Sequence, residues 1–352
     1  MADAPEVLFE RRGSAGIITL NRPKALNAVT LGMVRAMRAR LDAWHSDPGV
    51  TRVVITGSGD RAFSAGGDIR QVWELGRAGR QQEALVYWRE EYQLNTVIKR
   101  YAKPYIALID GIVMGGGVGV SIHGTHRVAG DKFLFAMPEA NIGFFPDIGA
   151  TWFLPRMPGE LGAWCALTAD RLRAGDGLAA GVATHRVSSG RLGDVLDALC
   201  GTASVDAILA DFAVPGEGGP ITTAIAAINS LFVGDTVEAV LANLDRAAAS
   251  AGPAAGWAKG TAATIRSRSP TSLKIALAQV RRGGQMTFEE CMRTEFRIVS
   301  RIVYGKDFYE GVRATLVDKD NAPKWHPAAL ADVSDTDVEH YFAPLADELV
   351  VP

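Results

Sequence analysis

The apolar positions of this chain recur with two different spacings, which predict an alternation of strands and helices. The helical spacing, with apolar residues at steps of three and four, is clearest at Val34, Met37, Leu41 and Trp44. Thr30 is a suitable N-cap for this helix, which we expect to end near His45. Short runs rich in β-branched and aromatic residues predict strands at residues 6–10, 16–20, 52–56, 105–109, 126–129, 133–136 and 182–187.

Further helical patterns follow these strands along the chain. We predict helices at residues 81–100, 118–123, 151–155, 159–168, 175–180 and 190–200. A repeated order of strand, strand and helix is typical of stacked mixed units, and it does not fit one doubly wound sheet. The sequence therefore indicates an α/β fold.

A cluster of glycine and proline at residues 215–220 is the clearest break in composition. We expect residues 1–214 to form a core that holds the functional site, and residues 221–352 to form a mostly helical C-terminal extension packed on it. Within the extension, an alanine-rich helix is predicted at 235–250, and Ser269-Pro270 is suited to start another. Thr287 and Glu290 form a capping box for a helix that runs to about Tyr304.

Composition and charge exclude several functional classes. The 352 residues are 48% hydrophobic and 22% charged, which are ordinary values for a globular protein. A net charge of −2 gives no bulk attraction to nucleic acid or to anionic membranes. No run of about 18 apolar residues is present, so we expect no membrane span. The three cysteines and six histidines form no cluster with metal-ligand spacing, which predicts no metal site.

The first ten residues bear on location. They are acidic and lack an apolar run, unlike secretory signals and Arg/Ser-rich transit peptides. We therefore expect a reducing, cytoplasmic location, where the three cysteines stay free and behave as small apolar residues.

Two glycine-rich loops each precede a predicted helix. In the first, at residues 63–69, Asp68 can cap the following helix, and Gln71 occupies the third helical position. This arrangement leaves the Gly67 N–H without a partner at the positive end of the helix dipole. A simple tight turn would explain the two glycines equally well.

The second loop contains Gly115, Gly116 and Gly117, directly before the helix predicted at 118–123. Three successive glycines allow the backbone to approach a ligand closely, and the helix start again presents free N–H groups. Neither GxGxxG nor GxxxxGK[ST] is present, so a dinucleotide or P-loop nucleotide site is not expected.

The loop at residues 137–149 carries two carboxylates, Glu139 and Asp147. Its other residues are largely apolar, and burial among them would raise the pKa of Glu139, as suits an acid–base group. A local role in the turn is the alternative for Glu139. Glu90 and Glu91 adjoin on the helix at 81–100, where a solvated charge pair is the simplest interpretation.

Several motifs point together to a known family. Four of them occur in order at residues 21–27 (NRPKALN), 65–69 (AGGDI), 114–119 (MGGGVG) and 138–139 (PE). With these motifs the chain resembles the crotonase (enoyl-CoA hydratase/isomerase) superfamily. A closer resemblance, to its 3-hydroxyisobutyryl-CoA hydrolase branch, the thioesterases of valine breakdown, rests on residues 89–92 (REEY), 144–147 (FFPD), 269–274 (SPTSLK), 307–314 (DFYEGVRA) and 318–320 (DKD). The match covers nearly the whole chain.

The resemblance implies a ClpP/crotonase-like spiral of ββα repeats with a helical C-terminal region. It also implies an oxyanion hole made by the N–H groups of Gly67 and Gly116. An acyl-CoA would lie across the fold, its nucleotide and pantetheine near Lys24, Ala25, Leu26, Ala65, Asp68 and Ile69. Lys24 could meet a phosphate, although a solvated lysine is the alternative.

The resemblance also bears on the reaction. Hydratases of the superfamily use two glutamates; one matches Glu139, whereas the other falls at Gly119, which cannot accept a proton. Asp147 stands where typical hydratases have a glycine-type turn. Both departures imply hydrolysis, with Glu139 either attacking the thioester carbonyl or activating water, two routes that the sequence leaves open. Asp147 would accept a hydrogen bond from a substrate 3-hydroxyl, and Glu91 would help to order the hydroxyacyl end.

Two other functions remain open at this point: a hydratase or isomerase that uses Glu139 alone, and a CoA-binding protein without turnover. We expect an acyl-CoA as the small-molecule partner and no cofactor, since CoA is part of the substrate. The sequence does not separate 3-hydroxyisobutyryl from 3-hydroxypropionyl groups. A homo-oligomer is possible because crotonases often form trimers, although the extension could cover that interface.

Overall fold

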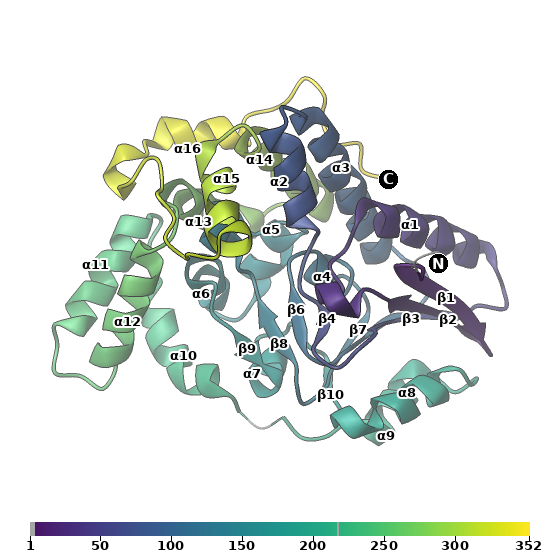
Figure 1. Cartoon of the computed structure of the whole chain (residues 1–352). Coiled ribbons are helices and arrows are strands. Elements are labelled where there is room, and N and C mark those ends of the chain that lie inside the picture. The colour runs from purple at the N-terminus through teal and green to yellow at the C-terminus, as the bar shows by residue number, and fades with distance from the viewer. Residues whose placement is uncertain (1–3, 217) are drawn as a thin grey trace.

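Two β-sheets form the centre of the molecule in a computed structural model that describes residues 4–216 and 218–352 (Figure 1). One sheet has the order β1 (Val7–Arg12), β2 (Ala15–Leu20), β3 (Arg52–Gly57), β5 (Tyr105–Ile109), β7 (His126–Ala129) and β10 (His185–Arg186). The other has the order β4 (Ala62–Ser64), β6 (Ile112–Met114), β8 (Leu134–Ala136) and β9 (Leu172–Arg173). Apart from the antiparallel pairs β1–β2 and β8–β9, neighbouring strands run parallel.

Three successive strand pairs build both sheets at once. In β3–β4, β5–β6 and β7–β8, the first strand joins the larger sheet and the second joins the smaller one. The α2 helix follows the first pair and the short α4 follows the second, which gives a rising spiral of ββα units. The prediction of an α/β spiral of ββα repeats is confirmed.

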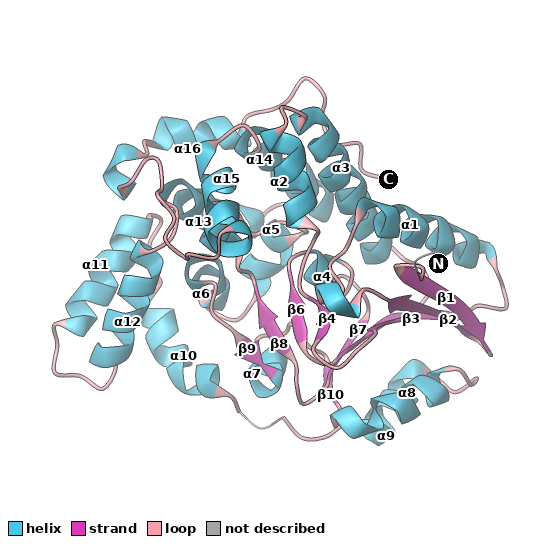
Figure 2. Cartoon of the chain, in the orientation of Figure 1, coloured by secondary structure: helices cyan, strands magenta, loops and turns pink. Residues whose placement is uncertain are grey.

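Helices surround the sheets (Figure 2). Those of the core are α1 (Leu31–Ser46), α2 (Ile69–Arg77), α3 (Gln81–Lys99), α4 (Gly116–Gly119), α5 (Ala150–Phe153), α6 (Leu161–Thr168), α7 (Ala174–Ala179), α8 (Leu192–Leu199) and α9 (Val205–Phe212). Those of the extension are α10 (Pro220–Leu231), α11 (Val237–Ala248), α12 (Ala255–Arg266), α13 (Pro270–Gly283), α14 (Phe288–Ile302), α15 (Lys306–Val312) and α16 (Asp335–Phe342). The Thr30 hydroxyl accepts the Met33 N–H at the start of α1, and Thr287 and Glu290 form the predicted capping box of α14.

Several sequence predictions of local structure are wrong. The helix predicted at 118–123 is only Gly116–Gly119, because the φ of 43° at Gly115 lets the chain turn directly from β6 into α4. The strand predicted at 182–187 shortens to His185–Arg186. The strands β4, β6 and β9 were not expected, since two- and three-residue strands carry almost no periodicity. The helices α9, α10, α12 and α16 were not expected either.

The C-terminal extension packs against the core through several helices. The α13 helix contacts α6, α14 contacts α3, and α15 contacts the 3₁₀ turn at Glu139–Ile142. The rings of Trp88 on α3, of Phe144, and of Phe308 on α15 pack together within one continuous apolar cluster, with ring centroids 5.6–6.2 Å apart. Glu217, in the predicted break at 215–220, and Met1–Asp3 of the acidic N-terminal segment lie outside the described residues. The division at 214 and 221 stays a prediction.

A substitution at Gly143 tests this packing. Gly143 ends the 3₁₀ turn with a φ of 65°, and a Cβ there would overlap the carbonyl oxygen of Asp307 on α15. We expect Gly143→Ala to lower the free energy of unfolding by about 2 kcal/mol or more, measured by chemical denaturation.

Gly79→Ala is the matched control for the backbone conformation alone. Gly79 has a φ of 74°, and nothing lies within 4 Å of an added Cβ. Its replacement should cost only about 1 kcal/mol. Equal losses in the two variants would show that α15 does not constrain the turn.

Candidate active site

One cleft of about 490 Å³ gathers residues from both glycine loops, α3 and the 137–149 loop. The sequence-predicted residues that line it are Lys24, Ala25, Leu26, Ala65, Gly67, Asp68, Ile69, Glu91, Gly116, Glu139 and Asp147. All of the proposed catalytic and substrate-binding positions therefore meet in a single cleft, although they come from segments more than 120 positions apart in the sequence.

The two glycine loops lie against each other at the bottom of this cleft. The Val29 backbone holds the first loop, since its N–H donates to Gly66 O and its carbonyl accepts the Asp68 N–H, both at 2.9 Å. A Cβ on Gly116 would lie 3.1 Å from the Gly67 nitrogen and 2.8 Å from Glu91 Oε1. Any side chain at 116 would therefore push apart the loop and the carboxylate, so this approach requires glycine.

The N–H groups of Gly67 and Gly116 are unpaired. Neither donates a hydrogen bond within residues 4–216 and 218–352. Gly67 stands one position before Asp68, whose side chain accepts the Gln71 N–H and caps α2, and Gly116 is the first residue of α4. Two free N–H donors at the starts of two helices present partial positive charge to the cleft.

Glu139 is the first residue of the 3₁₀ turn that follows β8, and its carboxyl group is buried, with 5% of the residue exposed. A Cβ on Gly115 would lie only 3.4 Å from Glu139 Oε1, so the carboxyl group faces the second glycine loop. The other oxygen, Oε2, is buried without a hydrogen-bond partner. Burial, and then the charge of Asp147, raise the pKa of Glu139 well above its usual value.

Glu90 and Glu91 have separate roles on α3. Glu90 lies at the surface and accepts hydrogen bonds of 2.7 Å from Nε and Nη2 of Arg35, as expected for a solvated residue. Glu91 points inward, is 2% exposed, and accepts a hydrogen bond of 3.0 Å from the Tyr87 hydroxyl. Burial, followed by the charge of Asp147, raises the pKa of Glu91. The interpretation of the two as one solvated pair is therefore wrong for Glu91.

Asp147 completes the group of buried carboxylates in the cleft. It accepts a hydrogen bond of 2.8 Å from the Tyr92 hydroxyl. Burial raises the pKa of Asp147 to about 7, against the opposing effect of that hydroxyl and of its own backbone N–H. The carboxyl group can therefore change its charge near neutral pH.

Sequence reasoning missed a further buried acid, Glu295 on α14. It is fully buried, and burial raises its pKa to about 8. The sequence carried a signal, because Cys291, Glu295, Ile298 and Ile302 are spaced four, three and four apart, so a glutamate occupies the buried stripe of an amphipathic helix.

Other side chains fill the space beside Gly119, the position at which hydratases of the superfamily have their second glutamate. A Cβ on Gly119 would lie 2.9 Å from Asn95 Nδ2 and 3.0 Å from Ile148 Cβ. Asn95 is buried, and both polar atoms of its side chain lack a hydrogen-bond partner among the described residues. A glutamate at 119 would therefore have no room beside α3 and the 146–149 turn.

Cationic side chains from three segments line the mouth of the cleft. Lys24, Arg70 and Lys319 line it and are exposed. Lys319 follows a π-helical turn at Arg313–Val317, whose Leu316 also lines the cleft and is 39% exposed. No sequence pattern had placed this part of the extension at the site. Asp68, by contrast, is engaged in structure, since it pairs with Arg22 at 3.1 Å besides capping α2.

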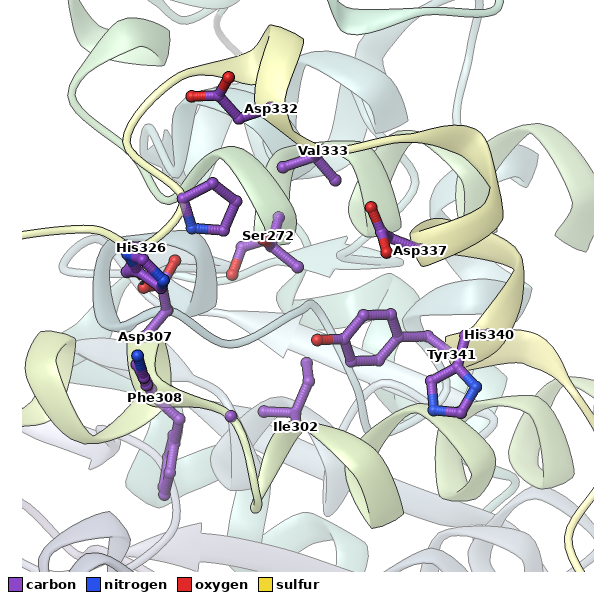
Figure 3. Close-up of a pocket in the computed structure, with 15 residues that line it drawn as sticks. Ser272, Ile302, Asp307, Phe308, His326, Asp332, Val333, Asp337, His340 and Tyr341 are labelled. Atoms are coloured by element: carbon purple, nitrogen blue, oxygen red, sulfur yellow. Dashed lines mark hydrogen bonds between the residues drawn. The ribbon is translucent and has the colours of Figure 1, made fainter.

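A second cavity of about 470 Å³ lies between α13, α15 and α16 (Figure 3). Two of its acidic groups, Asp307 and Asp337, are already engaged in hydrogen bonds. Asp307 accepts hydrogen bonds from the Ser269 hydroxyl at 2.6 Å and from the His326 N–H at 2.7 Å. Asp337 accepts the Ser334 N–H at the start of α16. Among the described residues that line it, this cavity has no buried carboxyl oxygen without a partner, unlike Glu139 in the first cleft.

Within the described residues, no group of three or more His, Cys, Asp or Glu could hold a metal ion. No described helix is long and apolar enough to cross a membrane. The expectation of no metal and no cofactor stays a prediction.

Known proteins resemble this chain along almost its whole length. A family model described as enoyl-CoA hydratase/isomerase matches residues 15–342. Proteins named mitochondrial 3-hydroxyisobutyryl-CoA hydrolase are 44% identical in Xenopus tropicalis, 45% in Rattus norvegicus and 44% in Homo sapiens. Each alignment covers 97% of this chain and 89–90% of the relative.

Solved structures agree on the fold. A crystal structure titled as a carnitinyl-CoA dehydratase from Mycobacterium thermoresistibile has a TM-score of 0.92 and 42% identity, covering 99% of both chains. One titled as an enoyl-CoA hydratase from Rhodobacter sphaeroides has a TM-score of 0.88 and 36% identity, covering 98% of this chain and 100% of the other. The printed names differ in reaction, so the site must decide the chemistry.

The buried Asp147 predicts a pH-dependent cost in stability. The folded protein holds this proton more tightly than the unfolded chain does, because the pKa rises from 3.8 to about 7. Ionisation between these values therefore destabilises the fold as the pH rises. We expect Asp147→Asn to be more stable than the wild type at pH 8, by on the order of 1–3 kcal/mol, and to show little gain near pH 4. Chemical denaturation at both pH values measures this, and a gain independent of pH would contradict it.

Proposed function

The chain belongs to the enoyl-CoA hydratase/isomerase family, and from this premise we propose that it is an acyl-CoA thioester hydrolase acting on 3-hydroxyisobutyryl-CoA. The products are 3-hydroxyisobutyrate and CoA, a step of valine breakdown. The observation that carries the proposal is the buried, unpartnered carboxyl oxygen of Glu139 beside two unpaired backbone N–H groups, with glycine at 119. The hydrolase names of relatives 44–45% identical support it.

We assign the N–H groups of Gly67 and Gly116 to the thioester oxygen. As the carbonyl carbon is attacked, negative charge develops on this oxygen, and preorganised donors stabilise that charge with no reorganisation. Because the two donors are unpaired in the free protein, binding the oxygen breaks no existing hydrogen bond. This polarisation serves enolisation and hydrolysis alike, so it supports the substrate class and leaves the reaction to the carboxylates.

Glu139 then has two possible routes. As a nucleophile, its carboxylate adds to the thioester carbon, the C–S bond breaks, and CoA leaves as a thiolate that takes up a proton. Water then opens the mixed anhydride and restores the carboxylate. As a general base, Glu139 takes a proton from the attacking water and passes it to the leaving sulfur. Both routes need the ionised form, whose formation burial opposes in the free protein.

Asp147 and Glu91 are assigned to the hydroxyacyl end. Asp147 has one oxygen occupied by the Tyr92 hydroxyl, which leaves acceptor capacity for a substrate 3-hydroxyl. Glu91 lies beside Gly116 and is held by Tyr87, so it can order the same end of the substrate. An acyl group without the hydroxyl would leave this remaining acceptor capacity of the buried Asp147 unused, which disfavours such substrates.

We propose that the CoA moiety of the bound substrate extends out of the cleft through its cationic mouth. Lys24, Arg70 and Lys319 are exposed there and can meet phosphate groups, while Ala25, Leu26, Ala65 and Ile69 offer apolar contact to the pantetheine arm. No cofactor is required, because CoA is part of the substrate.

The alternative function is a hydratase or isomerase on the same scaffold. The titles of the solved structures favour it, since they name a dehydratase and a hydratase. Against it stands Gly119, where Asn95 and Ile148 leave no room for the second glutamate that positions water for addition to an alkene.

Location and assembly are further proposals. We propose a cytoplasmic location because the three cysteines are free, as a reducing compartment would keep them. The vertebrate relatives, by contrast, are named mitochondrial. We also propose that a homo-oligomer can form, as crotonases often do. Size-exclusion chromatography with light scattering would measure the assembly.

A thiol-release assay with 3-hydroxyisobutyryl-CoA separates the candidates. Free CoA should appear with the wild type. Loss of enoyl absorbance with an enoyl-CoA, without thiol release, would instead identify a hydratase. The absence of both signals would indicate a CoA-binding protein without turnover.

In the same assay, Glu139→Gln should abolish hydrolysis because an amide is neither a base nor an effective nucleophile. The variant should still fold and bind CoA. Glu90→Gln, on the surface of α3, is the matched control and should keep wild-type turnover. Turnover like the wild type's in Glu139→Gln would remove this residue from the mechanism.

Asp147→Asn should raise KM for 3-hydroxyisobutyryl-CoA and weaken the preference for it over isobutyryl-CoA. An amide accepts the substrate hydroxyl less strongly than a carboxylate does, by about 1 kcal/mol or roughly fivefold in kcat/KM. Steady-state kinetics on the two thioesters give the ratio. An unchanged ratio would refute the orienting role.

A further inference from the structure

The turn that carries Asp147 has a strained backbone. Ile148 has a φ of 54°, a left-handed conformation that a β-branched residue rarely adopts. Gly149 continues the turn with a φ of 90°. A strained backbone conformation of this kind persists only where contacts with the surrounding structure hold it in place, and such conformations are concentrated at functional sites.

Glu295 ties one side of this turn. Its two carboxyl oxygens accept the N–H groups of Gly149 and Thr151, at 2.7 and 2.8 Å. Gly149 is the N-cap of α5 and Thr151 its second residue, so the carboxyl group lies across the start of that helix. Because Glu295 is fully buried, these hydrogen bonds have no water to compete with them.

Gln279 and His123 hold the two residues that flank Asp147. The Gln279 side-chain amide donates to Pro146 O at 2.5 Å, and His123 Nε2 donates to Ile148 O at 2.7 Å. Gln279 is fully buried, and His123 is 6% exposed. The residues before and after Asp147 are therefore each held by a buried side chain, whereas Asp147 itself is held by Tyr92.

Two of these ties come from the C-terminal extension, Gln279 from α13 and Glu295 from α14. We propose that Glu295 and Gln279 are positioning residues that hold the strained turn at 146–151 and thereby set the place of the Asp147 carboxylate. The helical extension then determines the selectivity for acyl groups with a 3-hydroxyl. The inference rests on the proposed thioesterase function.

Selectivity is the property that this arrangement should affect most. A hydrogen bond from a substrate hydroxyl is directional, and it weakens steeply when donor and acceptor are misaligned. An acyl group without the hydroxyl does not use that bond. Loosening the turn should therefore impair the hydroxyacyl substrate more than the plain one, which a general loss of folding would not do.

The experiment compares the kcat/KM ratio for 3-hydroxyisobutyryl-CoA over isobutyryl-CoA among variants of the full-length protein. In Glu295→Gln, an amide NH₂ group would face one of the two backbone N–H donors, so one of the two hydrogen bonds to the turn is lost. In Gln279→Met, an apolar side chain of similar length removes the donor to Pro146. Each change should lower the ratio by roughly threefold, less than the roughly fivefold expected for Asp147→Asn, because a displaced carboxylate still accepts the substrate hydroxyl, although through a weaker hydrogen bond.

The double variant Glu295→Gln/Asp147→Asn provides a second readout. If Glu295 acts through Asp147, the double variant should have the same ratio as Asp147→Asn alone. A merely structural role would instead give independent, additive effects.

Glu290→Gln is the matched control on the same helix. Glu290 belongs to the exposed capping box with Thr287 and does not touch the turn. Its loss should lower the stability of α14 and leave the substrate ratio unchanged. Denaturation of every variant separates stability from selectivity, and if Glu295→Gln does not fold, Gln279→Met alone carries the test.

Folded Glu295→Gln and Gln279→Met proteins with the wild-type ratio would overturn the inference while leaving the thioesterase proposal intact. A wild type that releases no CoA, by contrast, would overturn the thioesterase proposal itself, and the positioning role with it.

Discussion

The central constraint on this molecule is the burial of carboxyl groups around one cleft. Glu91, Glu139, Asp147 and Glu295 are each at most 5% exposed, and burial is the largest effect on the pKa of each. The groups that oppose it are tyrosine hydroxyls and backbone N–H groups. Keeping several acids together without water is unfavourable, and a continuous apolar cluster running through core and extension offsets this cost.

The extension has more than one role in relation to this cleft. The segment around Leu316 and Lys319 lines its mouth, while Glu295 and Gln279 lie behind the turn that carries Asp147. The α15 helix closes against the turn that begins with Glu139. These helices therefore supply part of the packing that keeps water from the carboxyl groups.

The sequence predicted the regular elements where periodicity was long enough to read. The α1 helix, with its Thr30 cap, and the capping box of α14 are confirmed. The strands β4 and β6 were missed because three residues carry no pattern, and α4 was misplaced because glycines conceal a helix start. For the site, motif order predicted which residues meet, whereas the contrast between Glu90 and Glu91 depends on which face of α3 is covered. Glu295 was missed although it stands on an apolar stripe, and the mouth at 315–319 was missed because nothing local marks it.

The crowding around Gly119 has an evolutionary consequence. Asn95 and Ile148 fill the volume that a larger residue at 119 would need, and Ile148 belongs to the turn that Glu295 and Gln279 of the extension hold. A lineage carrying this arrangement cannot gain a second acid at that position by one mutation, because Asn95 and Ile148 would have to change together with Gly119. Descendants would therefore be expected to diversify through the acyl end of the cleft and to keep the reaction type.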